Sequence, residues 1–307
     1  MRITTNQILL TQLHGLQSSS AALLEAQERV SSGLRVRRMS DDPTAAHSVM
    51  LNDGALRAMT QYRRNIERAQ SRVLFEDQVL GQVGSLLTRA RELAIGQASA
   101  TANTETRLAA AAEVEEILHS LVQLGNTTYG GEFIFGGDQG QTAPFAVAGS
   151  RTTLTWGTPT GAAGMRPTQI GAQQSLTPTH DGASIFVQSG VLDAVRELAV
   201  ALAGAAPPVT PTPDAVQNIN AAQARIDAAL QAVQGLVGET GARANTLELT
   251  LANLGAFTTS LQAFQSELRD VDIEVAVTEL VTRQTAYQAA MLASSKVLNL
   301  SLTDYLR

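Results

Sequence analysis

The sequence has no cysteine and few aromatic residues, and both absences limit what the protein can do. Without cysteine there are no disulfides, no thiolate metal ligands and no cysteine nucleophile. Aromatic residues make up 4% of the 307 residues, with a single tryptophan, so a large aromatic-lined pocket is not expected.

No catalytic or metal-binding pattern is present. None of the four histidines (His14, His47, His119 and His180) has a second histidine three or four residues away, and no serine lies in a Gly-x-Ser-x-Gly motif. Asp41-Asp42 is better explained as helix caps than as a cation site, and His180-Asp181-Gly182 as a turn rather than a catalytic pair. We therefore predict no catalytic residue, no cofactor-binding residue, no metal site and no enzyme activity.

Charge and hydropathy argue against nucleic acid or a membrane as partner. The net charge of −6 comes from 22 basic and 28 acidic residues whose signs are mixed along the chain, so there is no basic patch. No stretch approaches the ~18 consecutive apolar residues that would span a bilayer. Residues 1–7 are polar where a secretory signal needs an apolar core, so export would proceed without a cleavable signal peptide.

Apolar residues at heptad spacing predict long helices at both ends of the chain. Neither end helix has enough helical neighbours within one chain to cover its seam, and an uncovered apolar seam is typical of a subunit interface. The predicted interface residues are Leu9, Leu13, Leu16, Leu23, Val30, Leu280, Met291, Leu298, Leu302 and Leu306. A fully closed intramolecular bundle is the alternative.

Between the ends, the pattern predicts more helices and one β-rich insert. A helix should begin at Pro43, and its seam from Ala55 to Ala94 has Glu76 as the only polar member. Further helices are expected over 105–124, with Leu108 on the apolar face, over 190–203, and from 214 to 275, where three closely spaced glycines should loosen the helix. Short β-type runs are expected at 132–135, 152–156 and 184–187.

The predicted fold is mainly α, a long antiparallel helical bundle or coiled coil with paired terminal helices and a small β-rich insert domain. We predict a terminal coiled-coil assembly domain of residues 1–40 and 272–307, a helical rod domain of residues 41–135 and 190–271, and a β-rich surface insert of residues 136–189. Two paired helices alone are marginal in water, so the ends should be flexible in the free monomer and become helical on assembly.

A set of short segments carries a resemblance to a known family. They are Met-Arg-Ile-Thr at 1–4, Val-Ser-Ser-Gly-Leu-Arg-Val at 30–36, Ser-Asp-Asp-Pro at 40–43, Tyr-Arg-Arg-Asn-Ile at 62–66, Gly-Ala-Arg-Ala-Asn at 241–245 and Ser-Leu-Thr-Asp-Tyr-Leu at 301–306. Together they resemble the flagellin superfamily, in particular its hook-associated protein three (hook–filament junction) family. The resemblance covers residues 1–137 and 188–307, and the segments at 40–43 and 301–306 favour the junction family over flagellin.

The resemblance implies a structural, extracellular role at the junction of hook and filament, needed for swimming motility. The implied partners are further copies of the chain in a ring or helical layer, the first hook-associated protein on the hook side, flagellin on the filament side, and a cytoplasmic export chaperone at the C-terminal helices. Export would use the flagellar type III apparatus. A flagellin-type filament subunit is the nearest alternative, and a secreted coiled-coil adhesin is a third.

One basic cluster, Arg35, Arg37 and Arg38, follows the first helix. It is a solvated linker in one interpretation. In the other, these arginines pair across a subunit boundary with acidic residues near Asp270–Asp272 or Glu274 of a neighbour.

Overall fold

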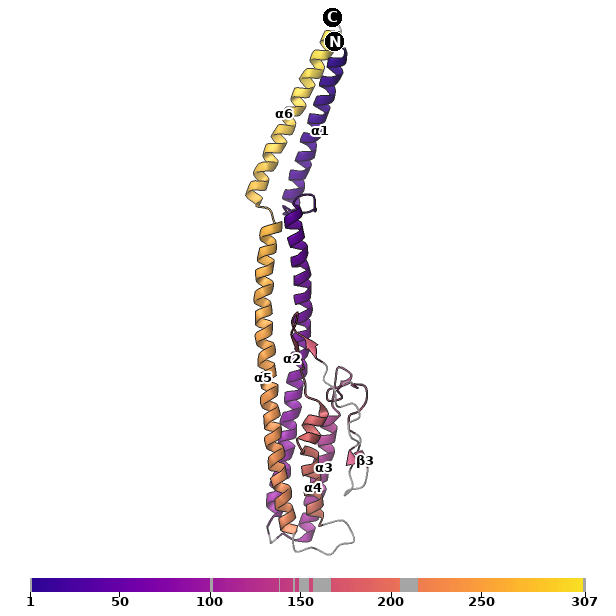
Figure 1. The fold of residues 1–307 in the computed structure, drawn as a ribbon, viewed down its shortest axis with the longest axis vertical. Helices are drawn as coiled ribbons and strands as arrows, with labels where there is room; N and C mark the ends of the chain where they lie inside the picture. The colour runs from indigo at the N-terminus through magenta and orange to yellow at the C-terminus, as the bar shows by residue number, and fades with distance from the viewer. Residues whose placement is uncertain are drawn as a thin grey trace. The chain divides into compact units, whose positions relative to one another are not determined.

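The structure, a computed structural model, describes residues 2–99, 102–137, 139–145, 147–148, 155–156, 167–204 and 215–305. It divides into two compact units, residues 1–58 with 256–307 and residues 59–255. The helices of the described residues are α1 (Arg2–Ser32), α2 (Pro43–Gln97), α3 (Thr104–Gly125), η1 (Ala183–Gln188, a π-helix), α4 (Val191–Ala203), α5 (Ala215–Arg269) and α6 (Ile273–Tyr305) (Figure 1). The predicted mainly helical fold with paired terminal helices and small β elements is confirmed.

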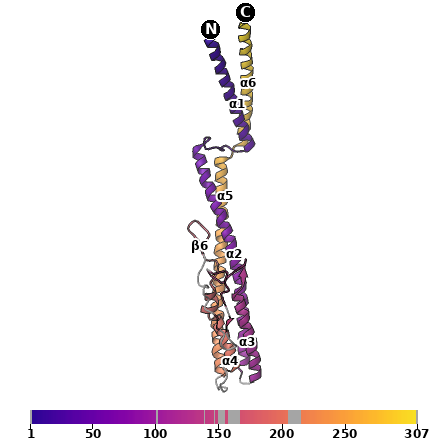
Figure 2. The same cartoon turned by 90° about the vertical axis from the view of Figure 1, so that its right-hand side faces the viewer.

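The first unit contains the antiparallel pair of α1 and α6, which run side by side in Figures 1 and 2. A short connection between α1 and α2 lies against the connection between α5 and α6. Leu34 and Asp270 form an antiparallel bridge, and the backbone N–H of Val271 donates to the carbonyl of Gly33 at 2.9 Å. Gly33 has φ +69°, a left-handed conformation that glycine adopts without strain, so it can end α1 at this point.

The helix expected from 214 to 275 ends earlier, as α5 at Arg269, and the separate helix expected at the C-terminal end of the chain is α6. The backbone leaves the helix at Asp270, where it pairs with Leu34, and Asp272 then accepts a hydrogen bond from the N–H of Glu274 at 3.0 Å at the start of α6. An apolar period alone gives no sign of this break. The three glycines at 235, 238 and 241, by contrast, lie within a continuous α5, so the expected local loosening is wrong.

The second unit is a bundle formed by parts of α2 and α5 with α3 and α4, and its core confirms the predicted seam of α2. Nine of the twelve seam positions are buried: Ile66, Ala69, Val73, Glu76, Leu80, Val83, Leu87, Ala90 and Ala94. Most pack with buried residues of α3, α4 and α5 in one cluster, which supplies the main hydrophobic stabilisation of the unit.

The predicted apolar face of α3 is confirmed in its second half, where Leu118, Leu121 and Val122 are buried, and is wrong in its first half. There Leu108 is 51% exposed, whereas Ala111 and Val114 are buried. Short alanine-rich helices contain two small-residue stripes, and only the packing against α4 decides between them.

The β-rich segment forms three small antiparallel pairs among the described residues: β1 (Thr128–Tyr129) with β2 (Glu132–Phe133), β3 (Val147–Ala148) with β4 (Thr155–Trp156), and β5 (Thr168–Gln169) with β6 (Ser175–Leu176). The run at 132–135 is strand only over β2. Of the run at 152–156, residues 152–154 lie outside the described part.

The expected strand at 184–187 is instead the π-helix η1. Asp181 accepts a hydrogen bond from the N–H of Ser184 at 3.0 Å, which favours a helical start. Ile185 and Phe186 are both fully buried in the same core cluster, whereas a strand would direct consecutive side chains to opposite faces. Burial of both side chains therefore favours the helical turn.

Candidate assembly surface

The α1–α6 pair buries very few of its side chains. Among its side chains whose burial the structure describes, only Ala26 and Ala276 are buried, each 4% exposed. Large apolar side chains of the pair remain exposed, and we call them the terminal stripe: Leu10, Leu13, Leu24, Ile273, Val275, Val277, Val281, Met291 and Leu292. An open hollow of about 610 Å³ follows α6 between Glu274 and Arg283. An apolar surface of this extent is typical of a protein–protein contact.

The structure places the ten predicted interface residues in three groups. Leu13 and Met291 are each 49% exposed. Leu16, Leu23, Val30 and Leu280 are half-buried, so the chain itself covers part of them. The side chains of Leu9, Leu298 and Leu302, and the whole of Leu306, lie outside the described part. The role of all ten in subunit contacts stays a prediction.

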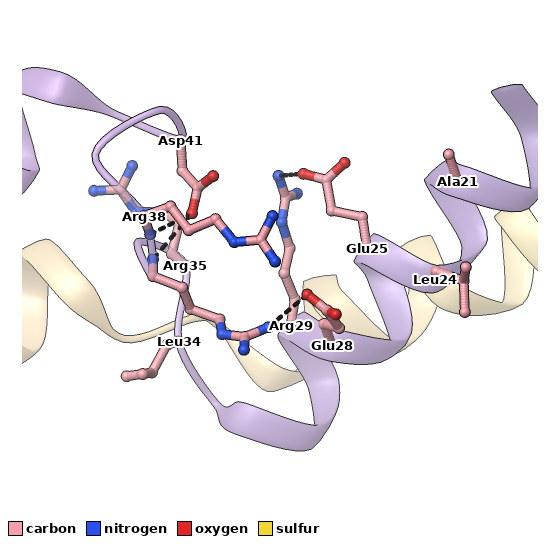
Figure 3. A pocket seen from close by; sticks show the side chains of 10 residues that line it. Ala21, Leu24, Glu25, Glu28, Arg29, Leu34, Arg35, Arg38 and Asp41 are labelled. Carbon is pink, nitrogen blue, oxygen red and sulfur yellow. Dashed lines mark hydrogen bonds and ion pairs between the residues drawn. The ribbon is translucent and has the colours of Figure 1, made fainter.

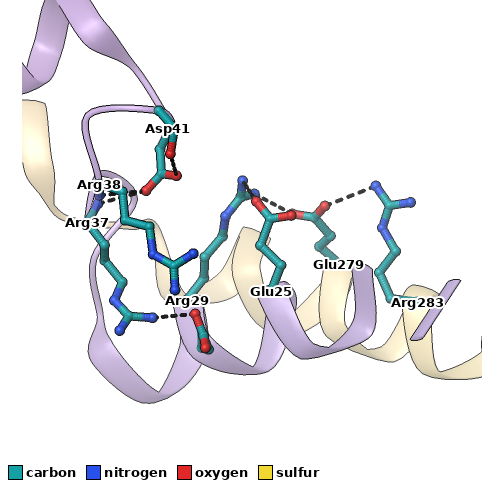
Figure 4. Close-up of polar contacts among 9 residues, drawn as sticks. Glu25, Arg29, Arg37, Arg38, Asp41, Glu279 and Arg283 are labelled. Carbon is teal, nitrogen blue, oxygen red and sulfur yellow. Dashed lines mark hydrogen bonds and ion pairs between the residues drawn. The ribbon is translucent and has the colours of Figure 1, made fainter. Parts of the chain in front are cut away.

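Ion pairs connect the two helices of the pair near the start of α6. Arg29 of α1 contacts Glu25 at 2.7 Å and Glu279 of α6 at 3.4 Å, and Glu279 also contacts Arg283 at 3.2 Å (Figure 4). Each of these side chains is at least one-third exposed, so solvent screens the pairs and each contributes little to stability. Their main effect is to orient the side chains on this face.

The three arginines of the basic cluster have different surroundings. Arg35 donates to the carbonyl of Leu268 at 2.7 Å and pairs with Asp42 at 3.3 Å. Arg37 pairs with Glu28 at 2.6 Å. The Arg38 guanidinium has no hydrogen bond or ion pair with any described residue, and Figure 3 shows it beside the paired groups.

The loop that carries the arginines is held by two aspartates. Asp41 accepts hydrogen bonds from the backbone N–H groups of Arg38 at 2.8 Å and Arg37 at 3.0 Å, and these bonds lower its pKa. Asp42 accepts from the N–H of Ala45 at 3.0 Å, which caps α2 and lowers the pKa of Asp42. The predicted capping role is confirmed for Asp42, while Asp41 instead closes the loop that precedes the helix.

The loop and α1 enclose a cavity of about 390 Å³ (Figure 3). Its charged lining includes four arginines and three carboxylates, and its apolar lining comes from Ala21, Leu24 and Leu34. Glu25 and Glu28 pair with Arg29 and Arg37, whereas Asp41 accepts the loop N–H groups and attracts the nearby Arg38 cation electrostatically without an ion-pair contact.

Sequence reasoning missed one buried polar group, in the second unit. Glu76 of α2 is fully buried and contacts His180, which also contacts Glu239 of α5. His180 pairs with these two glutamates and not with its sequence neighbour Asp181, and residues 180–182 lead into η1 without forming the expected turn. The sequence feature that could have indicated this buried group is Glu76, the only polar residue on an otherwise apolar seam.

The described residues contain no group of three or more side chains placed to hold a metal ion. No helix in the described part of the chain is long and apolar enough to cross a bilayer. Among the described residues, the terminal stripe is therefore the candidate surface for protein–protein contact.

Comparison with known proteins gives the family. Residues 3–140 match the bacterial flagellin N-terminal helical region, and residues 215–306 match the bacterial flagellin C-terminal helical region. The two matches lie at opposite ends of the chain and together cover most of it. The chain therefore belongs to the bacterial flagellin family.

Individual relatives divide between two kinds of flagellar protein. The chain is 29% identical to "Flagellar hook-associated protein 3" of Escherichia coli, over 98% of each chain. It is 25% identical to "Flagellin FlaB2" of Treponema pallidum, over 91% of each chain. Among solved structures, a putative flagellar hook-associated protein from Vibrio parahaemolyticus has a TM-score of 0.64 at 19% identity, covering 75% of this chain and all of that one. This last likeness supports the fold alone.

Proposed function

We propose that this protein is the structural component that joins the hook-associated zone of the bacterial flagellum to the flagellin filament. The observation that carries the proposal is the similarity along nearly the whole chain to a hook-associated protein 3. The exposed terminal stripe supports it, because a protein that works by assembly needs a surface for neighbouring copies. The protein would have no enzymatic role.

The partners follow from this proposal. Copies of the chain would form a ring or helical layer through α1 and α6, with the first hook-associated protein on one side and flagellin on the other. A cytoplasmic export chaperone would hold the C-terminal helices before export through the flagellar type III apparatus. The mature protein would be extracellular, at the hook–filament junction.

Deletion of the gene tests the proposal directly. If the protein is the junction component, cells that lack the gene should have bare hooks, secrete unassembled flagellin and not swim. Restoring the gene should restore swimming. Short or altered filaments on otherwise complete hooks would instead support a filament subunit, an alternative that the similarity to flagellins over 91% of the chain favours as second candidate. Normal swimming would contradict both the junction role and the filament role, and the secreted adhesin would be the remaining alternative.

The basic cluster belongs to the same proposal in a narrower form. Arg35 and Arg37 already have partners within the chain, so the residue best suited to pair with a neighbouring copy is Arg38. Glu274 at the start of α6 is exposed and borders the hollow on that helix, which makes it the matching anion. Like most exposed pairs, this one would affect selectivity and rate of assembly more than affinity.

A charge exchange tests that pairing. Arg38→Glu should reduce incorporation into flagella, and combining it with Glu274→Arg should restore incorporation because the two charges then attract again. Arg68→Glu on the exposed surface of the second unit is the matched control and should incorporate normally. Failure of the double variant to recover, with both variants folded, would rule out this pair.

A further inference from the structure

The second unit contains a buried histidine placed between two carboxylates from different helices. His180 is 5% exposed and lies in the segment that follows β6. Its ring Nδ1 is 2.7 Å from Oε1 of Glu76 in α2, and its ring Nε2 is 3.0 Å from Oε2 of Glu239 in α5. The same Oε1 of Glu76 accepts the backbone N–H of His180 at 3.0 Å. One residue therefore joins the insert to both long helices of the unit.

The geometry has a direct consequence for protonation. An ionised carboxylate only accepts hydrogen bonds, so each ring nitrogen must carry a proton to bond its partner. Neutral imidazole carries one proton and can satisfy one carboxylate only, with a nitrogen lone pair facing the other. Imidazolium satisfies both, with two charge-assisted hydrogen bonds.

Other charged groups around the histidine modify this preference without reversing it. On α5, Arg243 lies near Glu239 at 3.7 Å and its positive charge opposes that of the imidazolium. Arg72 of α2 and Glu132 of β2 pair with one another at 2.8 Å, so their charges largely cancel at His180. The Asp181 carboxylate accepts a hydrogen bond from the backbone N–H of Ser184 in η1 and not from His180.

The net effect is a raised affinity for the proton. Burial alone would lower the pKa of His180, but the hydrogen bonds to Glu76 and Glu239 outweigh it, so the pKa lies above its usual value of 6.5. The hydrogen bond from His180 in turn lowers the pKa of Glu239.

We propose that His180, Glu76 and Glu239 form a pH-sensitive latch that holds the segment 167–182 on α2 and α5 when the histidine is protonated. When the histidine loses its proton, its ring can donate to only one of the two carboxylates, and Oε2 of the fully buried Glu76 already has no hydrogen-bond partner among the described residues. The segment then opens more often. The segment keeps other attachments, among them the hydrogen bond from Asn65 to the carbonyl of Gln169 at 2.9 Å, the hydrogen bond from the N–H of Gly182 to the carbonyl of Phe135 at 3.2 Å, and the burial of Ile170.

The sign of the pH dependence follows by linkage. A group whose pKa is raised in the folded state contributes stability that is complete below its unfolded value, here 6.5, and is lost as pH rises through the folded value. For Glu239, whose pKa is lowered, the contribution is present above 4.5 and is lost as pH falls through the folded value. The contribution of His180 to the latch is therefore complete below pH 6.5 and is lost as the pH rises through the raised pKa of His180.

Amide hydrogen exchange on the full chain tests the latch between pH 5.5 and 9. The reporter is the His180 N–H with its neighbours in 167–182, measured relative to amides of α3 at 114–122 and corrected for intrinsic exchange. The protection ratio should fall as pH rises, by up to about tenfold per pH unit between 6.5, the usual pKa of histidine, and the raised pKa of His180 in the closed state, because one proton is linked; above that raised pKa it should level off. A ratio that stays constant or increases over this range would overturn the proposal.

Two variants separate the latch from a general alkaline effect. Glu239→Gln removes one carboxylate at an exposed position, where the side chain is 64% exposed, so the fold should persist while the midpoint moves to lower pH. Glu248→Gln, exposed on the same helix, is the matched control and should keep the wild-type midpoint. Equal midpoints in wild type and Glu239→Gln would contradict the latch. All of these residues lie in the second unit, so the result does not depend on the proposed function.

Discussion

Leu292 of α6 provides a quantitative test of the terminal stripe. It is 66% exposed in the isolated chain. Fully burying a leucine side chain contributes about 1.5–3 kcal/mol, so a neighbour that covers the remaining two-thirds would gain about 1–2 kcal/mol. Leu292→Ala removes most of that gain and should raise the subunit concentration needed for assembly by roughly fivefold to tenfold, since 1.4 kcal/mol is tenfold in affinity.

The same substitution should leave the monomer intact. An exposed side chain contributes little to folding, so the free energy of unfolding should change by less than about 0.5 kcal/mol. Leu74 on α2 has the same 66% exposure and is not part of the terminal stripe, which makes Leu74→Ala the matched control.

The assay is sedimentation of purified subunits with isolated hooks over a range of subunit concentrations, with thermal unfolding of each free variant as a check. A shift for Leu292→Ala alone supports the stripe as a subunit contact. Identical assembly of wild type and both variants would refute it. An equal shift for Leu74→Ala would show that exposure of a leucine, and not its place in the stripe, determines assembly.

Three further changes test local structure. Asp42→Ala removes the acceptor that caps α2, so thermal unfolding should occur at a lower temperature. In wild type, the stability that this cap contributes is present above pH 3.8 and is lost as pH falls through the lowered pKa of Asp42. Unfolding scans from pH 7 to pH 2.5 would detect this loss. Gly125→Ala places a Cβ 2.6 Å from Cδ2 of Phe145 and should cost about 1–3 kcal/mol by overpacking, measured by urea unfolding, whereas a neutral result would show that the Phe145 ring moves freely. Leu87→Ala in the core should cost about 2–5 kcal/mol in the same assay, and a cost below about 1 kcal/mol would contradict the packing described for α2.

The helices could be predicted from sequence because their apolar periods are long. The seam of α2 extends over forty residues with one polar member, and no other secondary structure buries that pattern. Pro43 after Asp42 fixed the start of the helix, because both residues favour the first turn for independent physical reasons.

Local tertiary packing determined what could not be predicted. In η1 the β-branched and aromatic residues Ile185 and Phe186 favour a strand by propensity, but both side chains are buried in the same core cluster. In α3, alanine fits either face, so contact with α4 decides the rotation. A separate helix at the C-terminal end was expected, but the backbone bridge from Asp270 to Leu34, more than 200 residues earlier, is contained in no local pattern.

The candidate site was predictable only in outline. Exposed leucines at heptad spacing indicated an interface, but the fraction that the chain itself covers, as at Leu16 and Leu280, requires the helix pair. Similarly, three nearby arginines look equivalent in sequence, whereas in the structure the side chains of Arg35 and Arg37 contact partners directly and that of Arg38 has only an electrostatic attraction to Asp41. The assignment of residues 1–40 with 272–307, 41–135 with 190–271, and 136–189 to separate domains stays a prediction.

The lack of cysteine makes the central claim directly measurable. Leu292→Cys introduces a single thiol on the terminal stripe, which a maleimide reagent can modify without background. If neighbouring copies cover the stripe, the thiol should react rapidly in the free subunit and be strongly protected in intact flagella. Equal reactivity in the two states, in flagella that assemble normally, would contradict the account.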